Sequence, residues 1–196
     1  MKAQNKYDIR QHMLARRRSL PEADCQALSH AVCQRFIQSV AVPDKARVAL
    51  YWPVHGEVDT RPLIPFLQQK QCALYWPVIH ASSPGEMRFA QCNRLHTMQP
   101  NRFGIPEPPI AWDDADEAPT LDIIITPLVA FDRRCQRLGM GGGYYDRLFE
   151  KNTKAKKIGV AYEFQYVETL PSEPWDQSLD QVVTEKQIHC AVSKIT

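Results

Sequence analysis

Residues 137–148, RLGMGGGYYDRL, form the stretch of the chain best suited to do chemistry. Four glycines within five positions leave the backbone bare, and a nearly continuous apolar run at residues 121–129 comes shortly before them. A glycine-rich connection between a buried strand and a helix exposes backbone N–H groups beside the positive end of the helix dipole, where anions bind. The sequence therefore predicts a phosphate-binding loop.

The loop belongs to neither common phosphate-binding class. The dinucleotide pattern GxGxxG, counted from the first glycine, would need glycine where Tyr144 stands, and no GK[ST] of the Walker pattern is near. Arg133, Arg134 and Arg137 precede the glycines and can hold phosphate oxygens. Asp146 falls in the first turn of the next helix, where a carboxylate can hold Mg²⁺ beside a polyphosphate. The alternative is a plain flexible turn, since glycine serves turns as readily as ligands.

Aromatic side chains gather on the elements around this loop, at Tyr51, Trp52, Trp76, Phe131, Tyr144 and Tyr145. At the carboxyl ends of parallel strands, such rings can line a slot for a flat heterocycle. More often they are simply core residues. Glu57 is the carboxylate best placed to face such a slot, although alone it has the pattern of an ordinary loop charge.

Two amphipathic helices are expected to precede the elements that carry this loop. The first covers residues 6–17 and has Lys6 and Arg10 one turn apart as a basic stripe. The second follows the capping-box pattern SLPE at residues 19–22 and ends near Pro43. Taken alone, the basic stripe is typical of a solvated helix face.

Strand and helix patterns alternate through the rest of the chain. The string ALYWPV occurs at residues 49–54 and again at 73–78, with a helix start at 59–62 between the two copies. A crossover of this length joins parallel strands. The remaining expected elements are strands at 87–89, 121–129, 157–162 and 181–184, a helix at 144–151, and an extended excursion at 100–119.

These elements predict one α/β domain over residues 1–196. We expect a mostly parallel central sheet with helices on both faces, in three layers, Rossmann-like but without the dinucleotide fingerprint. Because the buried run at 121–129 shows no alternation of polar and apolar residues, this strand should be covered on both faces.

Composition and charge exclude several classes of protein. The chain has 24 Lys and Arg against 22 Asp and Glu, a net charge of +2, which argues against nucleic-acid binding over the whole surface. Six cysteines without a CxxC pair predict reduced thiols. No apolar run approaches the roughly 20 residues of a membrane helix, and the start lacks a signal peptide's apolar stretch. We expect a cytoplasmic protein; a transit peptide is the alternative, disfavoured by one serine in the first 20 residues.

The loop and the segment IIITPLVAFD before it resemble the 5-formyltetrahydrofolate cyclo-ligase family, also called methenyltetrahydrofolate synthetase. Four further segments agree in order, KYDIRQHMLARR, ALYWPVHGEVDT, FGIPEP and EPWDQSLDQVVTE, so the resemblance spans nearly the whole chain. It implies ATP-dependent cyclisation of 5-formyltetrahydrofolate to 5,10-methenyltetrahydrofolate with release of ADP and phosphate. The implied partners are a reduced folate, ATP and Mg²⁺. From the chain itself we expect a monomer that binds neither nucleic acid nor membrane.

The resemblance also implies roles for individual residues. The implied ATP-binding residues are Lys6, Arg10, Arg137, Leu138, Gly139, Met140, Gly141, Gly142, Gly143, Tyr144 and Tyr145. The implied folate-binding residues are Trp52, Glu57, Met140, Gly141, Gly142, Gly143 and Tyr144. Arg137 and Tyr144 are the implied catalytic residues. Asp146 and Asp176 are the implied magnesium ligands, and Asp180 is a nearby alternative to Asp176.

One departure from the family pattern lies inside the loop. Some relatives carry lysine or arginine between these glycines, whereas Met140 and Gly142 are uncharged here. Charge compensation on a transferring phosphate would then fall on the neighbouring arginines and on Mg²⁺. Two other functions compete with the ligase. They are a non-catalytic nucleotide- or phosphosugar-binding regulator on the same scaffold, and an RNA-binding module that uses the basic helix.

Overall fold

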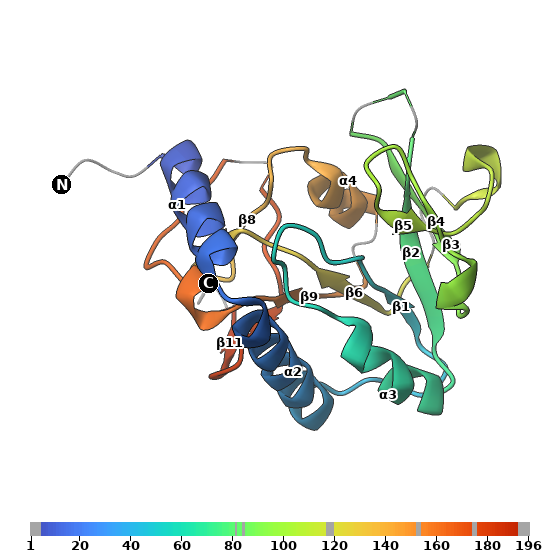
Figure 1. Ribbon diagram of the computed structural model, residues 1–196, viewed down its shortest axis with the longest axis horizontal. Coiled ribbons are helices and arrows are strands. Elements are labelled where there is room, and N and C mark those ends of the chain that lie inside the picture. Colours follow the sequence, from blue (N-terminus) through green and yellow to red (C-terminus); the bar gives the residue numbers. More distant parts are fainter. Residues whose placement is uncertain are drawn as a thin grey trace.

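The centre of the molecule is a seven-stranded sheet in the order β11-β10-β9-β6-β1-β2-β3 (Figure 1). The computed structural model describes residues 5–80, 82–83, 85–116, 120–151, 154–173 and 176–191. The five parallel strands are β1 (Arg47–Ala49), β2 (Ala73–Ile79), β6 (Ile123–Thr126), β9 (Lys156–Val160) and β10 (Gln181–Val183). The two edges are antiparallel, β3 (Met87–Gln91) and β11 (Ile188–Cys190). The prediction of a mostly parallel α/β sheet is confirmed.

Helices cover both faces of the sheet, as predicted. They are α1 (Lys6–Ser19), α2 (Glu22–Ser39), α3 (Ile64–Gln69), which continues the 3-10 turn η1 (Arg61–Leu63), and α4 (Tyr144–Lys151). Helices α2 and α3 pack on one face and α4 on the other, while α1 packs on the segment that follows β6. None of the helices in the described ranges is long and apolar enough to cross a membrane.

Alternation of side chains along the strands explains the two-sided core. In β6, Ile123 and Ile125 join the core under α2 and α3, whereas Ile124 joins the core under α4. Successive residues of a strand point to opposite faces, so a strand buried on both sides must be apolar throughout. All four residues of β6 are buried and three of them are isoleucine, which accounts for the nearly continuous apolar run in the sequence.

Two details of the predicted elements are wrong. The capping box at residues 19–22 does not form: the Ser19 hydroxyl donates to the carbonyl oxygen of Arg16, and the N-cap of α2 is Pro21, without a side-chain cap. The first ALYWPV copy is a strand only up to Ala49, whereas the second pairs first with β1 and then with β3 and stays a strand to Ile79. Beyond Ala49 the chain turns into a loop.

The proline-rich excursion is ordered by short elements. A two-stranded ribbon joins β4 (Gln99–Pro100) to β5 (Pro106–Glu107), and a 3-10 turn, η3 (Trp112–Asp114), follows. Residues 117–119 of the predicted excursion, and residues 174 and 175 of the tail segment EPWDQSLDQVVTE, lie outside the described residues.

A small ribbon connects the buried strand β6 to the glycine loop. Strands β7 (Ala130–Phe131) and β8 (Arg137–Leu138) pair antiparallel across a tight turn. The turn is held by Asp132, a fully buried carboxylate that accepts hydrogen bonds from the backbone N–H groups of Arg134, Gln136 and Leu170. The chain then enters the glycine loop and α4, so the predicted order of strand, loop and helix is confirmed.

Candidate active site

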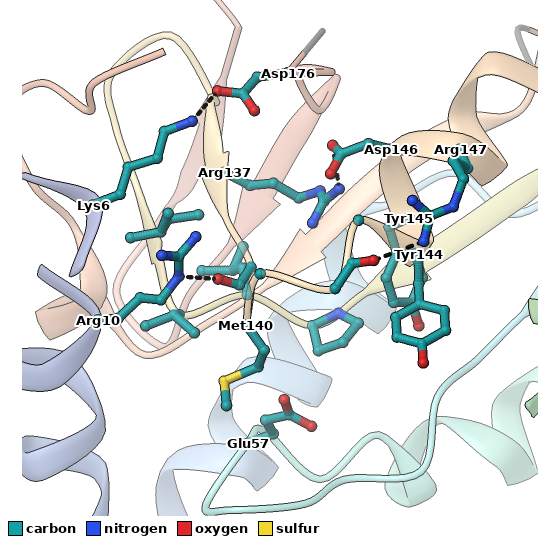
Figure 2. Close-up of a pocket in the computed structure, with 18 of the residues that line it drawn as sticks. Lys6, Arg10, Glu57, Arg137, Met140, Tyr144, Tyr145, Asp146, Arg147 and Asp176 are labelled. Carbon is teal, nitrogen blue, oxygen red and sulfur yellow. Dashed lines mark hydrogen bonds and ion pairs between the residues drawn. The ribbon is translucent and has the colours of Figure 1, made fainter. Parts of the chain in front are cut away.

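The glycine loop, residues 139–143, borders a cavity of about 530 Å³ (Figure 2). The cavity also takes its walls from the start of α1, the first turn of α4, residues 127–129 after β6, and the loop that carries Glu57. It therefore brings together residues that are far apart in the sequence. The guanidinium of Arg10 in α1, for example, donates from Nε to the carbonyl oxygen of Gly139 at 2.8 Å, across 129 positions of the chain.

The backbone of the loop requires glycine at two kinds of position. Gly141 and Gly143 have φ of +104° and +67°, in the region that side chains rarely adopt. Gly142 has no such constraint, but a Cβ there would lie 2.7 Å from the ring of Tyr144. The run of glycines thus follows from the local geometry of the chain as well as from any ligand.

The backbone N–H groups of the loop are available as hydrogen-bond donors. Within the described ranges, none of the backbone N–H groups of residues 139–143 donates to a protein group. Three of the loop's five carbonyl oxygens are instead occupied: Gly139 accepts from Arg10, Gly142 accepts from the side chain of Arg147 at 2.7 Å, and Gly143 accepts from the backbone N–H of Arg147 at 3.3 Å. A loop with free donors and occupied acceptors is suited to an anion.

Two ion pairs stand above the loop (Figure 2). Arg137, with a side chain only 5% exposed, donates from Nη2 to Asp146 at 2.6 Å, and Lys6 donates from Nζ to Asp176 at 2.6 Å. Burial lowers the pKa of Arg137, an effect that the charge of Asp146 opposes. The Nε of Arg137 is buried and has no hydrogen-bond partner in the described part of the chain.

Asp176 is held ionised by its neighbours. Burial raises the pKa of Asp176, but the hydrogen bonds from Lys6 and from the N–H of Glu173 outweigh burial, and the net effect lowers the pKa. Asp146 and Asp176 are thus carboxylates on the cavity wall, each paired with a cation. No group of three or more His, Cys, Asp and Glu side chains in the described ranges could hold a metal ion by itself. Two carboxylates fit Mg²⁺, because this ion is usually bound through one or two carboxylates together with phosphate oxygens.

Glu57 lies on the opposite side of the cavity, in the loop after β1 (Figure 2). Its side chain is 8% exposed, and its Oε1 lies 3.9 Å from Nη2 of Arg17, whose side chain is fully buried. Arg17 also donates to the carbonyl oxygens of Val54, His55 and Leu128. Burial raises the pKa of Glu57 to about 7, although the charge of Arg17 and a hydrogen bond from the Val54 N–H oppose the rise. A buried cation of α1 therefore fixes the loop that presents Glu57.

Most of the residues predicted for the site line this cavity, but several do not. Trp52 packs near Trp76, with ring centroids 6.1 Å apart, and lies outside the cavity wall, so its contact with folate stays a prediction. Asp180 accepts from the backbone N–H of Lys157 at 2.7 Å, also away from the cavity.

The two arginines before the loop also lie outside the cavity, contrary to our expectation that they hold phosphate. Arg134 pairs with Asp132 at 3.3 Å, and Arg133 lies 3.7 Å from Glu168. The buried Asp132 forms an ion pair with Arg134 inside the β7–β8 turn. The guanidinium of Arg134 therefore stabilises the turn and lies outside the cavity.

The cavity also has lining residues that the sequence did not single out. They are Pro127, Leu128, Val129, Arg147 and Glu150. The first three were predicted as the last residues of the strand at 121–129, but that strand, β6, ends at Thr126, and they form the loop at its carboxyl end. Arg147 stands next to Asp146 in the quoted loop motif, but its partner Gly85 is 62 positions away, which no local pattern reveals.

The fold and the cavity define a three-layer α/β protein in which a glycine loop with free N–H groups lies opposite a buried carboxylate. Residues 2–185 match the model of the 5-formyltetrahydrofolate cyclo-ligase family. The chain is 38% identical to the 5-formyltetrahydrofolate cyclo-ligase of Escherichia coli (strain K12) over 175 residues, which cover 88% of this chain and 96% of the relative. It is 34% identical to that of Haemophilus influenzae, with 93% and 99% covered.

Solved structures agree with the sequence relatives. The NMR structure of Aquifex aeolicus 5,10-methenyltetrahydrofolate synthetase superposes with a TM-score of 0.81 at 33% identity, covering 97% of this chain and 95% of that one. The synthetase of Mycoplasma pneumoniae has a TM-score of 0.71 at 27% identity, with 93% and 99% covered. The chain therefore belongs to the 5-formyltetrahydrofolate cyclo-ligase family and is a ligase of folate one-carbon metabolism.

Proposed function

We propose that the chain converts 5-formyltetrahydrofolate to 5,10-methenyltetrahydrofolate at the expense of ATP, with release of ADP and phosphate. It would act as a monomer on two small molecules, a reduced folate and ATP, without nucleic acid or membrane. A cytoplasmic location is part of the proposal, and six free cysteines are compatible with it. One observation carries the proposal for the site: the donor-rich glycine loop and the buried Glu57 face the same cavity.

The loop side of the cavity is suited to the triphosphate of ATP. Lys6, Arg10 and Arg137 supply positive charge around the loop, and residues 139–143 supply unpaired N–H groups. Asp146 and Asp176 would hold Mg²⁺, which when bound supplies charge stabilisation at the phosphate oxygens. Arg137 is the proposed catalytic cation, because a guanidinium presents several donors to phosphate oxygens in a fixed geometry.

The opposite side of the cavity is suited to the folate. Glu57 would bind polar groups of the pterin ring, while the loop residues 140–143 and the ring of Tyr144 would lie against the formyl end. The side chain of Met140 is 53% exposed and points toward Glu57 across the cavity (Figure 2). This arrangement supports a site in which the formyl group and the triphosphate meet at the loop.

The proposed reaction has two chemical steps. The formyl oxygen on N5 attacks the γ-phosphorus of ATP and the bond to ADP breaks, which leaves an iminium-like carbon that carries a phosphate. The N10 amine then adds to this carbon and loses its proton, and the carbon–oxygen bond breaks as phosphate departs. The methenyl carbon is left bonded to both nitrogens. Positioning and charge stabilisation suffice for such a transfer, and no covalent protein intermediate is required.

The purified protein with 5-formyltetrahydrofolate, ATP and Mg²⁺ should produce the near-ultraviolet absorbance of the methenyl product. Omission of any one component should abolish the signal. Arg137→Lys is the matched variant, since lysine keeps the charge but lacks the planar fork, and we expect it to lose at least about tenfold in kcat/KM. No product with all components present would refute the proposal.

A further inference from the structure

Two arginines hold the glycine loop from opposite sides. Arg10 of α1 donates to the carbonyl oxygen of Gly139, and Arg147 of α4 donates from Nη2 to that of Gly142. Four of the five loop residues are glycines, and the side chain of Met140 is 53% exposed, so the order of the loop depends on contacts of this kind. Arg10 belongs to the predicted ATP-binding set, whereas Arg147 has had no role.

Arg147 connects the loop to a distant part of the chain. The same Nη2 that contacts Gly142 also donates to the carbonyl oxygen of Gly85 at 2.6 Å, and Nε donates to that oxygen at 3.1 Å. Gly85 lies in the connection between β2 and β3. Its N–H in turn donates to the hydroxyl of Tyr144 at 3.2 Å. The backbone of Gly85, in the β2–β3 connection, thus binds the side chains of two residues of α4, Tyr144 and Arg147.

The geometry of Gly85 favours glycine, because any larger residue would be strained by the positive φ and would displace the guanidinium of Arg147. Its φ is +87°, and a Cβ there would lie 2.5 Å from Nη2 of Arg147. Gly143, with φ of +67°, is similarly close, with a Cβ position 2.9 Å from Nη1. The guanidinium of Arg147 therefore lies between the backbone of Gly85 and that of the glycine loop, while its side chain remains exposed to solvent. Arg147 and Tyr144 line both the cavity at the glycine loop and a second cavity of about 330 Å³, so they lie between the two spaces.

We propose that Arg147 and Gly85 form a strut that positions the glycine loop for the phosphates of the nucleotide. Arg147 fixes the carbonyl oxygen of Gly142, and this holds the neighbouring N–H groups in a conformation that can receive phosphate oxygens. Arg147 acts as a positioning residue through the loop, and its anchor is the β2–β3 connection. The inference rests on the proposed function for the identity of the ligand.

The test is a double-mutant cycle of Arg147→Ala, Gly85→Ala and the double variant, with KM measured for ATP and for the folate separately. If the two residues act as one strut, each single variant should raise the KM for ATP about tenfold, the loss of about 1.4 kcal/mol. The double variant should then also show about tenfold and not about a hundredfold. The KM for the folate should change much less. Arg147→Lys should recover only part of the loss, because one ammonium group replaces a fork.

Two matched controls separate the strut from general damage. Gly104→Ala places alanine at a φ of +73° with no atom within 4 Å, so it carries the backbone strain of Gly85→Ala without the clash. Arg16→Ala removes another arginine that donates to a backbone carbonyl, that of Phe164 at 3.2 Å, away from the cavity. Both should leave the KM for ATP unchanged.

The same cycle, measured as calorimetric binding of a non-hydrolysable ATP analogue, tests the strut independently of turnover. If the wild-type protein binds the analogue but forms no methenyl product, the proposed reaction is refuted. The strut is then tested by the binding measurements alone. The strut is overturned if Arg147→Ala leaves nucleotide affinity unchanged, if the two substitutions add, or if the wild-type protein binds no nucleotide. A merely structural role would lower the active fraction and leave both KM values as they are.

Discussion

Glu57 should make the folded protein less stable as the pH rises, and Glu57→Gln should remove that dependence. Burial raises the pKa of this carboxyl from 4.5 to about 7 in the folded protein. The folded state therefore holds the proton over a pH range in which the unfolded chain has released it. Such a group stabilises the fold most below pH 4.5, and its contribution is lost as the pH rises toward 7.

The size of the effect follows from the two pKa values. With pKa values of 4.5 unfolded and about 7 folded, integration of the proton-binding difference from about pH 5.5 to about pH 8 gives a loss of about 2 kcal/mol. For a chain of 196 residues this corresponds to about 4–8 °C in Tm. The glutamine variant also leaves Arg17 without its carboxylate, but Arg17 remains charged throughout this range, so that cost does not vary with pH.

The assay is urea unfolding of the wild-type protein and the Glu57→Gln variant at several pH values between about 5.5 and about 8. Subtraction of the two free energies of unfolding cancels the other titrating groups. The variant should gain about 2 kcal/mol relative to the wild type as the pH rises. A difference that is constant with pH, or that changes in the opposite direction, would show that Glu57 is not held in a desolvated site.

Three further predictions concern the loop and its ion pairs. Gly142→Ala should lower kcat/KM by about tenfold or more, because its Cβ would meet the Tyr144 ring at 2.7 Å, while Tm should hardly change. Asp146→Asn removes one proposed metal ligand, so the Mg²⁺ concentration for half-maximal activity should rise about tenfold; an unchanged titration would exclude this role. Lys6→Ala breaks a partly exposed pair with Asp176 and should cost less than about 1 kcal/mol in unfolding but raise the KM for ATP; a large loss of stability would contradict this.

Much of the fold could be predicted from local sequence patterns. Helix α4 has the predicted bounds of 144–151, because a glycine run ends where helix-forming residues begin. The first ALYWPV copy shows the limit of such reasoning: its letters equal those of the second copy, but only the second has a partner strand along its full length. Strand propensity thus depends on neighbours that the local string does not contain.

The candidate site, too, could be predicted from the sequence only in part. The glycine loop was recognisable, since its residue types express a backbone requirement that is local. Arg17 and Arg147 were not, because each guanidinium donates to a backbone carbonyl oxygen far away in the chain. That oxygen belongs to Leu128 for Arg17, 111 positions away, and to Gly85 for Arg147, 62 positions away. Any residue can supply a carbonyl, so no residue type marks the partner. Arg133 and Arg134 were misplaced for the related reason that a buried carboxylate, Asp132, draws Arg134 away.

The most direct test of the proposed reaction follows the formyl oxygen. The protein is supplied with ATP, Mg²⁺ and 5-formyltetrahydrofolate labelled with ¹⁸O in the formyl group, and the released phosphate is analysed by mass spectrometry. Attack of the formyl oxygen on the γ-phosphorus predicts one labelled oxygen in each phosphate and a methenyl product without label. Unlabelled phosphate alongside methenyl product, or release of the label as water, would contradict the proposed mechanism.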